Sequence, residues 1–236
     1  MTVSLPPRRL MLPPPYAQHW LDAGDVLDAA VARAPGEGAG TLVWQWVAGA
    51  GGPGRLDFAV VLEPDMPLAQ ARLAFAAGMA ATCEALAAHC PPERPLRIRW
   101  PSEIRFDTNR LGGARLAVAP GTDEADTPDW MVFAVELIGD RDHLEAPGAF
   151  PGSISLKEED FGDPPAIVEG FAAHLMLLFD RWKHDGPQAV AARLAARLEE
   201  GGAITDEGDL LRDGARHALR LALERAEWRD DRGPRL

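Results

Sequence analysis

The chain has 236 residues, enough for one domain with a sizeable core plus a small additional element. Its 24 lysines and arginines are outnumbered by 36 acidic residues, and the formal net charge of −12 disfavours binding to nucleic-acid phosphates. The sequence has neither an apolar run long enough to cross a bilayer nor a secretory signal, so we expect a cytoplasmic protein without membrane contact.

The first half of the chain predicts a helix, a hairpin and a second helix. Residues 1–16 contain five prolines and are expected to form an extended arm. Apolar residues at helical spacing predict a helix over 17–34, weakened by Gly24. The β-rich segments 41–47 and 55–62 flank a glycine-rich stretch and predict a β-hairpin. An apolar stripe predicts a helix over 67–89, ended by Pro91 and Pro92.

The second half alternates between strands and helices. Strands are predicted at 96–100, 103–107, 114–118 and 129–138, and helices at 165–184, 187–199 and 215–228. Residues 203–211 predict a small hairpin. This order predicts an α+β fold with a mixed, mostly antiparallel sheet and helices packed on one face. We expect an N-terminal arm (1–16), one main domain (17–200) and a small C-terminal extension (201–236).

The segment 96–116 contains the most informative motif. In order, it contains Trp100-Pro101, Ser102-Glu103, Arg110 and Gly112-Gly113. It resembles the signature hairpin of the biotin protein ligases, in which Trp-Pro is followed by Asn-Asp, a lysine and a small-Gly pair. Residues 153–159 resemble another segment of these enzymes that leads into a long helix. Over residues 17–199 the chain resembles the biotin/lipoate A/B protein ligase family, with its own C-terminal extension.

The resemblance implies an ATP-dependent reaction. The family activates a carboxylate of biotin or lipoate with ATP and Mg²⁺, and passes the acyl group to a lysine of a carrier domain. Arg110 occupies the position of the family lysine and is the candidate catalytic residue. The residues that the resemblance assigns to substrate binding are Gln45, Arg55, Arg99, Trp100, Pro101, Glu103, Gly112 and Gly113. The two cysteines and six histidines show no metal-ligand spacing, so we predict no resident metal site.

Several residues depart from the family pattern. The loop after the first strand of the hairpin keeps its glycines but only one arginine, Arg55. Ala23-Gly24-Asp25 stand where the family has a Ser-Thr pair for the ureido ring of biotin. These differences leave three hypotheses: an acyl ligase or transferase, a catalytically degenerate module that binds an acyl or adenylate ligand or a carrier protein, and a structural or homodimeric protein. Glu103 could point either to solvent or into a pocket.

Overall fold

The structure is a computed structural model that describes residues 8–47, 49, 52–90, 94–146, 148 and 150–236. Its centre is a seven-stranded sheet with the order β1-β2-β3-β7-β6-β5-β4, in which β1 and β2 run parallel and the other neighbours antiparallel. The strands are β1 (Ala17–Trp20), β2 (Thr41–Val47), β3 (Gly54–Leu62), β4 (Leu96–Arg99), β5 (Glu103–Phe106), β6 (Asn109–Val118) and β7 (Met131–Asp140). The predicted α+β class is confirmed.

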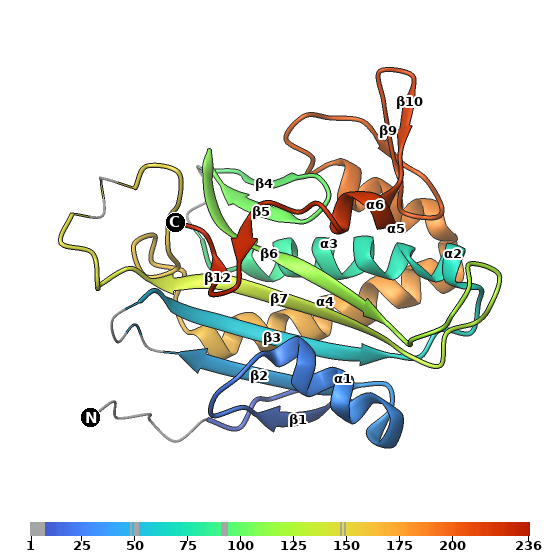
Figure 1. Ribbon diagram of the computed structural model, residues 1–236, viewed down its shortest axis with the longest axis horizontal. Helices are drawn as coiled ribbons and strands as arrows, with labels where there is room; N and C mark the ends of the chain where they lie inside the picture. The colour runs from blue at the N-terminus through green and yellow to red at the C-terminus, as the bar shows by residue number, and fades with distance from the viewer. Residues whose placement is uncertain (1–7, 48, 50–51, 91–93, 147, 149) are drawn as a thin grey trace.

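Three helices cover one face of the sheet: α3 (Leu73–Ala87), α4 (Pro164–Asp185) and α5 (Pro187–Ala195) (Figure 1). The short α2 (Leu68–Ala71) precedes α3, so the helix predicted over 67–89 is confirmed with a break at Arg72. The rings of Phe133 and Phe171 stack with centroids 5.8 Å apart and join β7 to α4. We call this the helix side of the sheet. Pro91 and Pro92 lie outside the described residues.

The opposite face, which we call the open side, is covered only in part. α1 (Val26–Glu37) packs there, with Val26 and Ala30 in one apolar cluster with Val43 and Ala59. The prediction of a helix over 17–34 was therefore wrong at its start, where β1 forms instead. Gly24 adopts a φ of +115°, and the Asp25 carboxylate accepts hydrogen bonds from the first turn, so the helix cannot begin earlier.

The C-terminal extension folds back onto the sheet. Its first part contains β8 (Ala203–Ile204), β9 (Leu210–Arg212) and β10 (Ala215–His217), of which β8 and β9 confirm the predicted hairpin. The helix predicted over 215–228 was wrong, because α6 (Leu219–Leu223) is only five residues long. It ends early because the chain then turns to bury Trp228 against the open side.

The last eleven residues, 226–236, form what we call the strap. It contains β11 (Arg229–Asp230) and β12 (Gly233–Pro234), and β12 contacts β6 and β7. Figure 1 shows this red segment crossing the sheet on the open side, away from α3 and α4. Within the described part of the chain, no helix has the length and hydropathy needed to cross a membrane. The strap therefore lies over the strands that carry the predicted site.

Candidate functional site

One row of paired residues crosses the sheet on its open side. In the strand register, Gln45 pairs with Asp57, Asp57 with Glu136, Glu136 with Gly113, and Gly113 with Glu103. Paired residues of neighbouring strands point to the same face of a sheet. We call this set the polar row. It runs across β2, β3, β7, β6 and β5 and brings together three carboxylates that are far apart in the sequence.

The first part of the polar row is a buried hydrogen-bonded pair. Gln45 Nε2 donates to Asp57 Oδ2 at 2.7 Å and to the carbonyl oxygen of Gly24 at 3.0 Å, and Arg55 Nε lies 3.2 Å from the same Asp57 oxygen. Because both neighbours of Nε2 are acceptors, the orientation of the Gln45 amide is fixed. Burial raises the pKa of Asp57 to about 7, although Arg55 and Gln45 oppose the shift.

Two acceptors of this pair have no hydrogen-bond partner. Gln45 Oε1 and Asp57 Oδ1 are buried and accept no hydrogen bond from any described residue. The two side chains are only 1% and 2% exposed. An unsatisfied buried acceptor costs ~1–3 kcal/mol, so such atoms point to a missing partner.

The middle of the row is held by arginines. Arg115 Nη2 donates to both carboxylate oxygens of Asp25 at 2.6 and 2.7 Å, and its Nε lies 2.6 Å from Glu136 Oε1. Burial alone would raise the pKa of Asp25, but Arg115 and the backbone N–H groups of Asp28 and Leu27 hold it below its ordinary value. The buried charge of Glu136 is thus neutralised from one side.

The far end of the row is a second carboxylate–arginine pair. Glu103 Oε1 lies 3.3 Å from Arg110 Nε and 3.7 Å from Arg105 Nη1. Glu103 is only 7% exposed, so it points into the site and not to solvent. This contact resolves the alternative that the sequence left open. It also means that the Arg110 guanidinium is already partly neutralised by a carboxylate.

Positions 112 and 113 require glycine because neither has room for a side chain. A Cβ at Gly112 would lie 2.1 Å from the carbonyl oxygen of Glu136, and a Cβ at Gly113 would lie 2.5 Å from the Trp228 ring. Trp228 thus fills the gap that the glycine leaves in the polar row. Its Nε1 donates to Ser102 Oγ at 3.0 Å in a buried hydrogen bond.

The strap closes over both ends of the row. Arg55 Nη1 donates to the carbonyl oxygen of Arg232 at 2.5 Å, and Arg110 Nη1 donates to that of Arg235 at 3.2 Å. From the strap, Arg229 Nε lies 3.4 Å from Glu136. The strap therefore takes up guanidinium N–H groups that a bound anion would otherwise use.

Two cavities that share part of their walls lie beside the row. The smaller, of about 260 Å³, is lined by Asp57, Glu136, Arg115 and Arg55, among others, and we call it the polar pocket. The larger, of about 860 Å³, runs between β6 and the C-terminal extension, and we call it the arginine groove. The residues that line both are Arg115, Arg229 and Asp231. The arginines of the groove are Arg72, Arg115, Arg220, Arg229 and Arg235, against the carboxylates Glu224, Asp230 and Asp231.

Most of the residues predicted for the site are brought together. Those on the open side, in or beside the polar row, are Gln45, Arg55, Glu103, Arg110 and Gly113. Gly112 is adjacent to the row but pairs with the helix-side residues Ile104 and Leu137. Residues 48, 50 and 51 of the glycine-rich loop lie outside the described residues. Of its described glycines, Gly49 and Gly54 adjoin the Asp140 carboxylate, which is an unfavourable neighbour for a phosphate, and Gly52 does not.

Three predicted residues lie at the β4–β5 edge of the sheet. Arg99 is exposed and forms a 3.5 Å ion pair with Glu199. Trp100 and Pro101 form the turn between β4 and β5, where the Trp100 ring packs against the helix-side core and lies 6.3 Å from the ring of His217. Their predicted role in substrate binding stays a prediction. In the strand register Arg99 pairs with Glu103, so it lies at the edge of the sheet next to the polar row.

The sequence interpretation missed Asp57, Arg115, Glu136 and Trp228. Asp57 and Glu136 are single charges inside otherwise apolar strand segments, and that is a signal that could have indicated them. In the described ranges, no three His, Cys, Asp or Glu side chains form a group that could hold a metal ion. We therefore assign no Mg²⁺ ligands.

The comparisons with known proteins agree with this architecture. The family model described as "Biotin/lipoate A/B protein ligase family" matches residues 12–196. None of the curated proteins compared with the chain matches it.

Several solved structures share the fold. A biotin protein ligase-like protein of unknown function from Silicibacter sp. TM1040 has a TM-score of 0.74 and 23% identity, over 91% of this chain and 97% of that one. The biotin protein ligase of Aquifex aeolicus in complex with biotin and ATP has a TM-score of 0.61 and 14% identity, over 86% and 95%. A biotin acetyl coenzyme A carboxylase synthetase from Helicobacter pylori with bound biotinylated ATP has a TM-score of 0.51 and 13% identity, over 85% of this chain and 98% of that one.

Proposed function

The chain belongs to the biotin/lipoate A/B protein ligase family, and on that premise we propose that it binds a small molecule with N–H donors in the polar pocket, beneath the strap. The ligand class is that of a cyclic urea or amide, as in biotin. The dithiolane ring of lipoate carries no N–H group. The observation that carries this proposal is the buried acceptor Asp57 Oδ1, which has no hydrogen-bond partner among the described residues and belongs to a residue that lines the pocket. Gln45 Oε1, next to it in the polar row, is a second such acceptor.

A urea-bearing ligand fits the chemistry of the pocket. One N–H group would satisfy Asp57 Oδ1 at the pocket wall, a second would be placed toward Gln45 Oε1 behind it, and the guanidinium of Arg55 or Arg115 could donate to a urea oxygen. The polar pocket has room for the ring, and an acyl chain would continue into the arginine groove along Leu27, Leu116 and Trp228. Binding of biotin by the Aquifex aeolicus protein supports this class of ligand.

The state of Asp57 makes binding depend on pH. Its pKa is about 7, so near neutral pH the carboxyl exchanges between neutral and ionised forms. An N–H donor from a ligand favours the ionised form. The proposal therefore expects affinity to rise as pH increases through 7, with release of a proton at lower pH.

Calorimetric titration tests the proposal with matched ligands. Biotin and desthiobiotin share the urea, whereas lipoate and octanoate carry a carboxylate and an acyl chain without N–H donors. We expect the first two to bind and the last two to bind at least ~10-fold more weakly, the size of one hydrogen bond to a charged group. Equal affinity for lipoate, or no binding of biotin, contradicts the proposal.

A second candidate is the ATP-dependent transfer of an acyl group to a lysine of a carrier protein. The arginine groove favours it, because five arginines against three carboxylates give a net positive lining beside Arg110 and Gly113. In this reaction the ligand carboxylate attacks the α-phosphate and releases pyrophosphate, and the lysine amine then displaces AMP. Arg110 would stabilise the developing negative charge.

Intact-mass analysis separates the two candidates. The full chain is incubated with ATP, biotin or lipoate, and a biotinyl or lipoyl carrier domain. Ligation predicts a carrier heavier by one acyl group, and Arg110→Ala should abolish this product while Arg99→Ala, at the exposed sheet edge, should not. Binding without an adduct supports the first candidate alone. The predicted homodimer is a separate question, and a measurement of the mass in solution over a series of protein concentrations tests it.

A further inference from the structure

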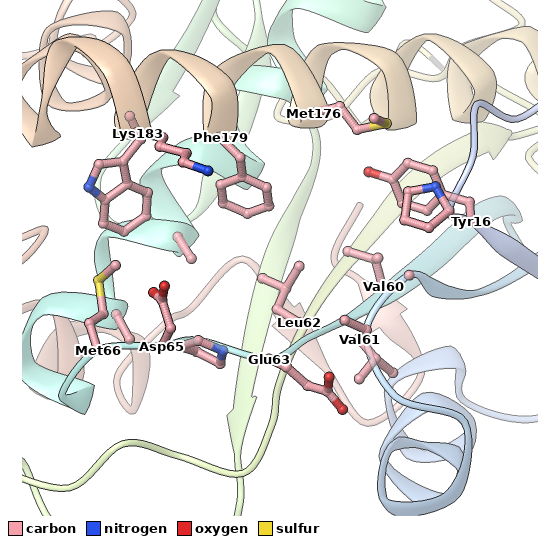
Figure 2. A pocket seen from close by; sticks show the side chains of 17 residues that line it. Tyr16, Val60, Val61, Leu62, Glu63, Asp65, Met66, Met176, Phe179 and Lys183 are labelled. Carbon is pink, nitrogen blue, oxygen red and sulfur yellow. The ribbon is translucent and has the colours of Figure 1, made fainter.

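A second cavity, of about 530 Å³, lies on the helix side of the sheet, away from the polar row. It is enclosed by the last turns of α4, the end of β3 and the segment around α2 (Figure 2). Its walls are largely apolar and aromatic, and include Leu62, Met66, Met176, Phe179 and Trp182. This size and lining are typical of pockets that bind small molecules.

Two side chains of opposite charge point into this cavity. Figure 2 shows the Asp65 carboxylate and the Lys183 ammonium facing the interior from opposite walls. Among the residues whose positions are described, neither forms an ion pair within 4.0 Å. The third charged lining residue, Glu63, turns toward α1, where its Oε1 would lie 2.8 Å from a Cβ at Gly38.

The other polar group of the cavity is already engaged. The Tyr16 hydroxyl donates to the carbonyl oxygen of Ala172 at 3.1 Å, and burial raises the pKa of Tyr16 to about 12. Tyr16 therefore contributes its ring to the wall and not a free charge. Recognition of a charged ligand here depends on Asp65 and Lys183.

We infer that this cavity binds a zwitterion with an apolar body, the class of free amino acids with an aromatic or branched side chain. A fatty or aromatic carboxylate would pair with Lys183 but face Asp65, and an amine would pair with Asp65 but face Lys183. A zwitterion meets both charges, and its side chain would pack against Phe179 and Trp182.

This inference does not depend on the proposed function. The polar pocket lies on the open side of the sheet, and the lining residues Val60 and Leu62 alternate with Ala59 and Asp57 along β3. Asp65 and Lys183 are exposed at the mouth of the cavity, so substitutions there leave the core intact. Loss of this site should leave biotin binding to the polar pocket unchanged.

A set of three related probes tests the inference on the full chain. L-phenylalanine, phenethylamine and 3-phenylpropionate share one ring and differ in their charges. By calorimetry or ligand-observed NMR, we expect phenylalanine to bind roughly tenfold more tightly than either of the others, because each lacks one charge-assisted contact. Equal or tighter binding of either single-charge probe, or no binding of any of the three, overturns the inference.

Substitutions of the two charged residues should change the order of affinities among the three probes, whereas misfolding would weaken the binding of all three. Asp65→Asn should remove the preference for phenylalanine over 3-phenylpropionate, and Lys183→Gln should remove the preference over phenethylamine. Lys157→Gln is the matched control, since Lys157 is the only other lysine of the chain and pairs with Asp142 at the surface. If all three variants keep the same order of affinities as the parent chain, the inference is wrong.

Discussion

The two sides of the sheet are made by alternate residues of the same strands and are buried in different ways. On the helix side, Phe58, Phe133 and Phe171 pack against one another with ring centroids 4.7 and 5.8 Å apart. On the open side, Asp57, Glu103 and Glu136 are buried instead, each beside an arginine. Apolar packing needs no partners, whereas each buried carboxylate needs a counter-charge and a cover.

The comparison shows what the strap contributes. The helix side is closed by α3, which is apolar and buried on nearly all sides, and by the amphipathic α4, whereas the open side is closed by eleven residues with two short strands. Trp228 is the main apolar anchor of this cover, and the backbone carbonyls of Arg232 and Arg235 accept hydrogen bonds from the arginines beneath. The open side is therefore the part of the molecule where a ligand can replace a protein cover.

The largest effect is expected at the strap anchor. Trp228→Ala removes a buried ring and should lower the free energy of unfolding by ~3–5 kcal/mol, measured by urea denaturation. The matched control is Ser102→Ala, which removes only the hydrogen bond to the indole and should cost ~1 kcal/mol. If the two variants lose the same free energy of unfolding, packing of the Trp228 ring does not hold the strap in place.

On the helix side, Gly78 of α3 packs tightly against Phe133 of β7. A Cβ there would lie 2.6 Å from the Phe133 ring, so Gly78→Ala should destabilise the fold by ~1–3 kcal/mol through overpacking. Gly170→Ala in α4 is the control, because its Cβ would meet Ala85 Cβ at 3.4 Å and gain up to ~1 kcal/mol of helix propensity. Thermal unfolding of both variants checks this, and stabilisation by Gly78→Ala would contradict the described packing.

Asp57 makes the stability of the open side depend on pH. Because burial raises its pKa to about 7, the folded chain holds this proton more tightly than the unfolded chain. The contribution of this proton to the free energy of unfolding is fully present below the unfolded pKa of about 4. It is lost as pH rises through 7, and the free energy of unfolding then falls by up to ~1.4 kcal/mol per pH unit. Asp57→Asn should reduce the decline in the free energy of unfolding between pH 4 and 7, measured by urea denaturation at each pH. If the free energy of unfolding of this variant falls with pH as steeply as that of the parent chain, the proton belongs to another group.

The smallest effect is expected at the start of α1. Asp25 caps this helix and pairs with Arg115, so Asp25→Ala should cost ~0.5–2 kcal/mol. Asp25→Asn keeps a capping oxygen and should cost less. If the two variants lose the same stability in urea, the charge pair and not the cap determines the loss.

Periodicity in the sequence was sufficient to predict most elements but not the polar row. The apolar stripes of α3 and α4 and the β-rich hairpin of β2 and β3 are local patterns, and the structure confirms them. The failures lie at 17–34 and 215–228, where a glycine with positive φ and the burial of Trp228 override helical spacing.

The site was predicted only where a motif marked it. Arg110, Gly112 and Gly113 were predicted from the hairpin pattern, whereas Asp57 and Glu136 required the strand register, which depends on residues far apart in the chain. The role of Gly113 could not be read from its own neighbours, because the ring that fills its space is at position 228.

The most direct test of the central claim is the titration of the Asp57 carboxyl by ¹³C NMR, with and without saturating biotin. Without ligand, we expect this carboxyl to titrate near pH 7, and Asp57→Asn identifies its signal. With biotin, a donated N–H should hold the carboxylate ionised and move the titration to lower pH. A titration of Asp57 that biotin leaves unchanged or moves to higher pH would contradict ligand binding at the free acceptors of the polar row.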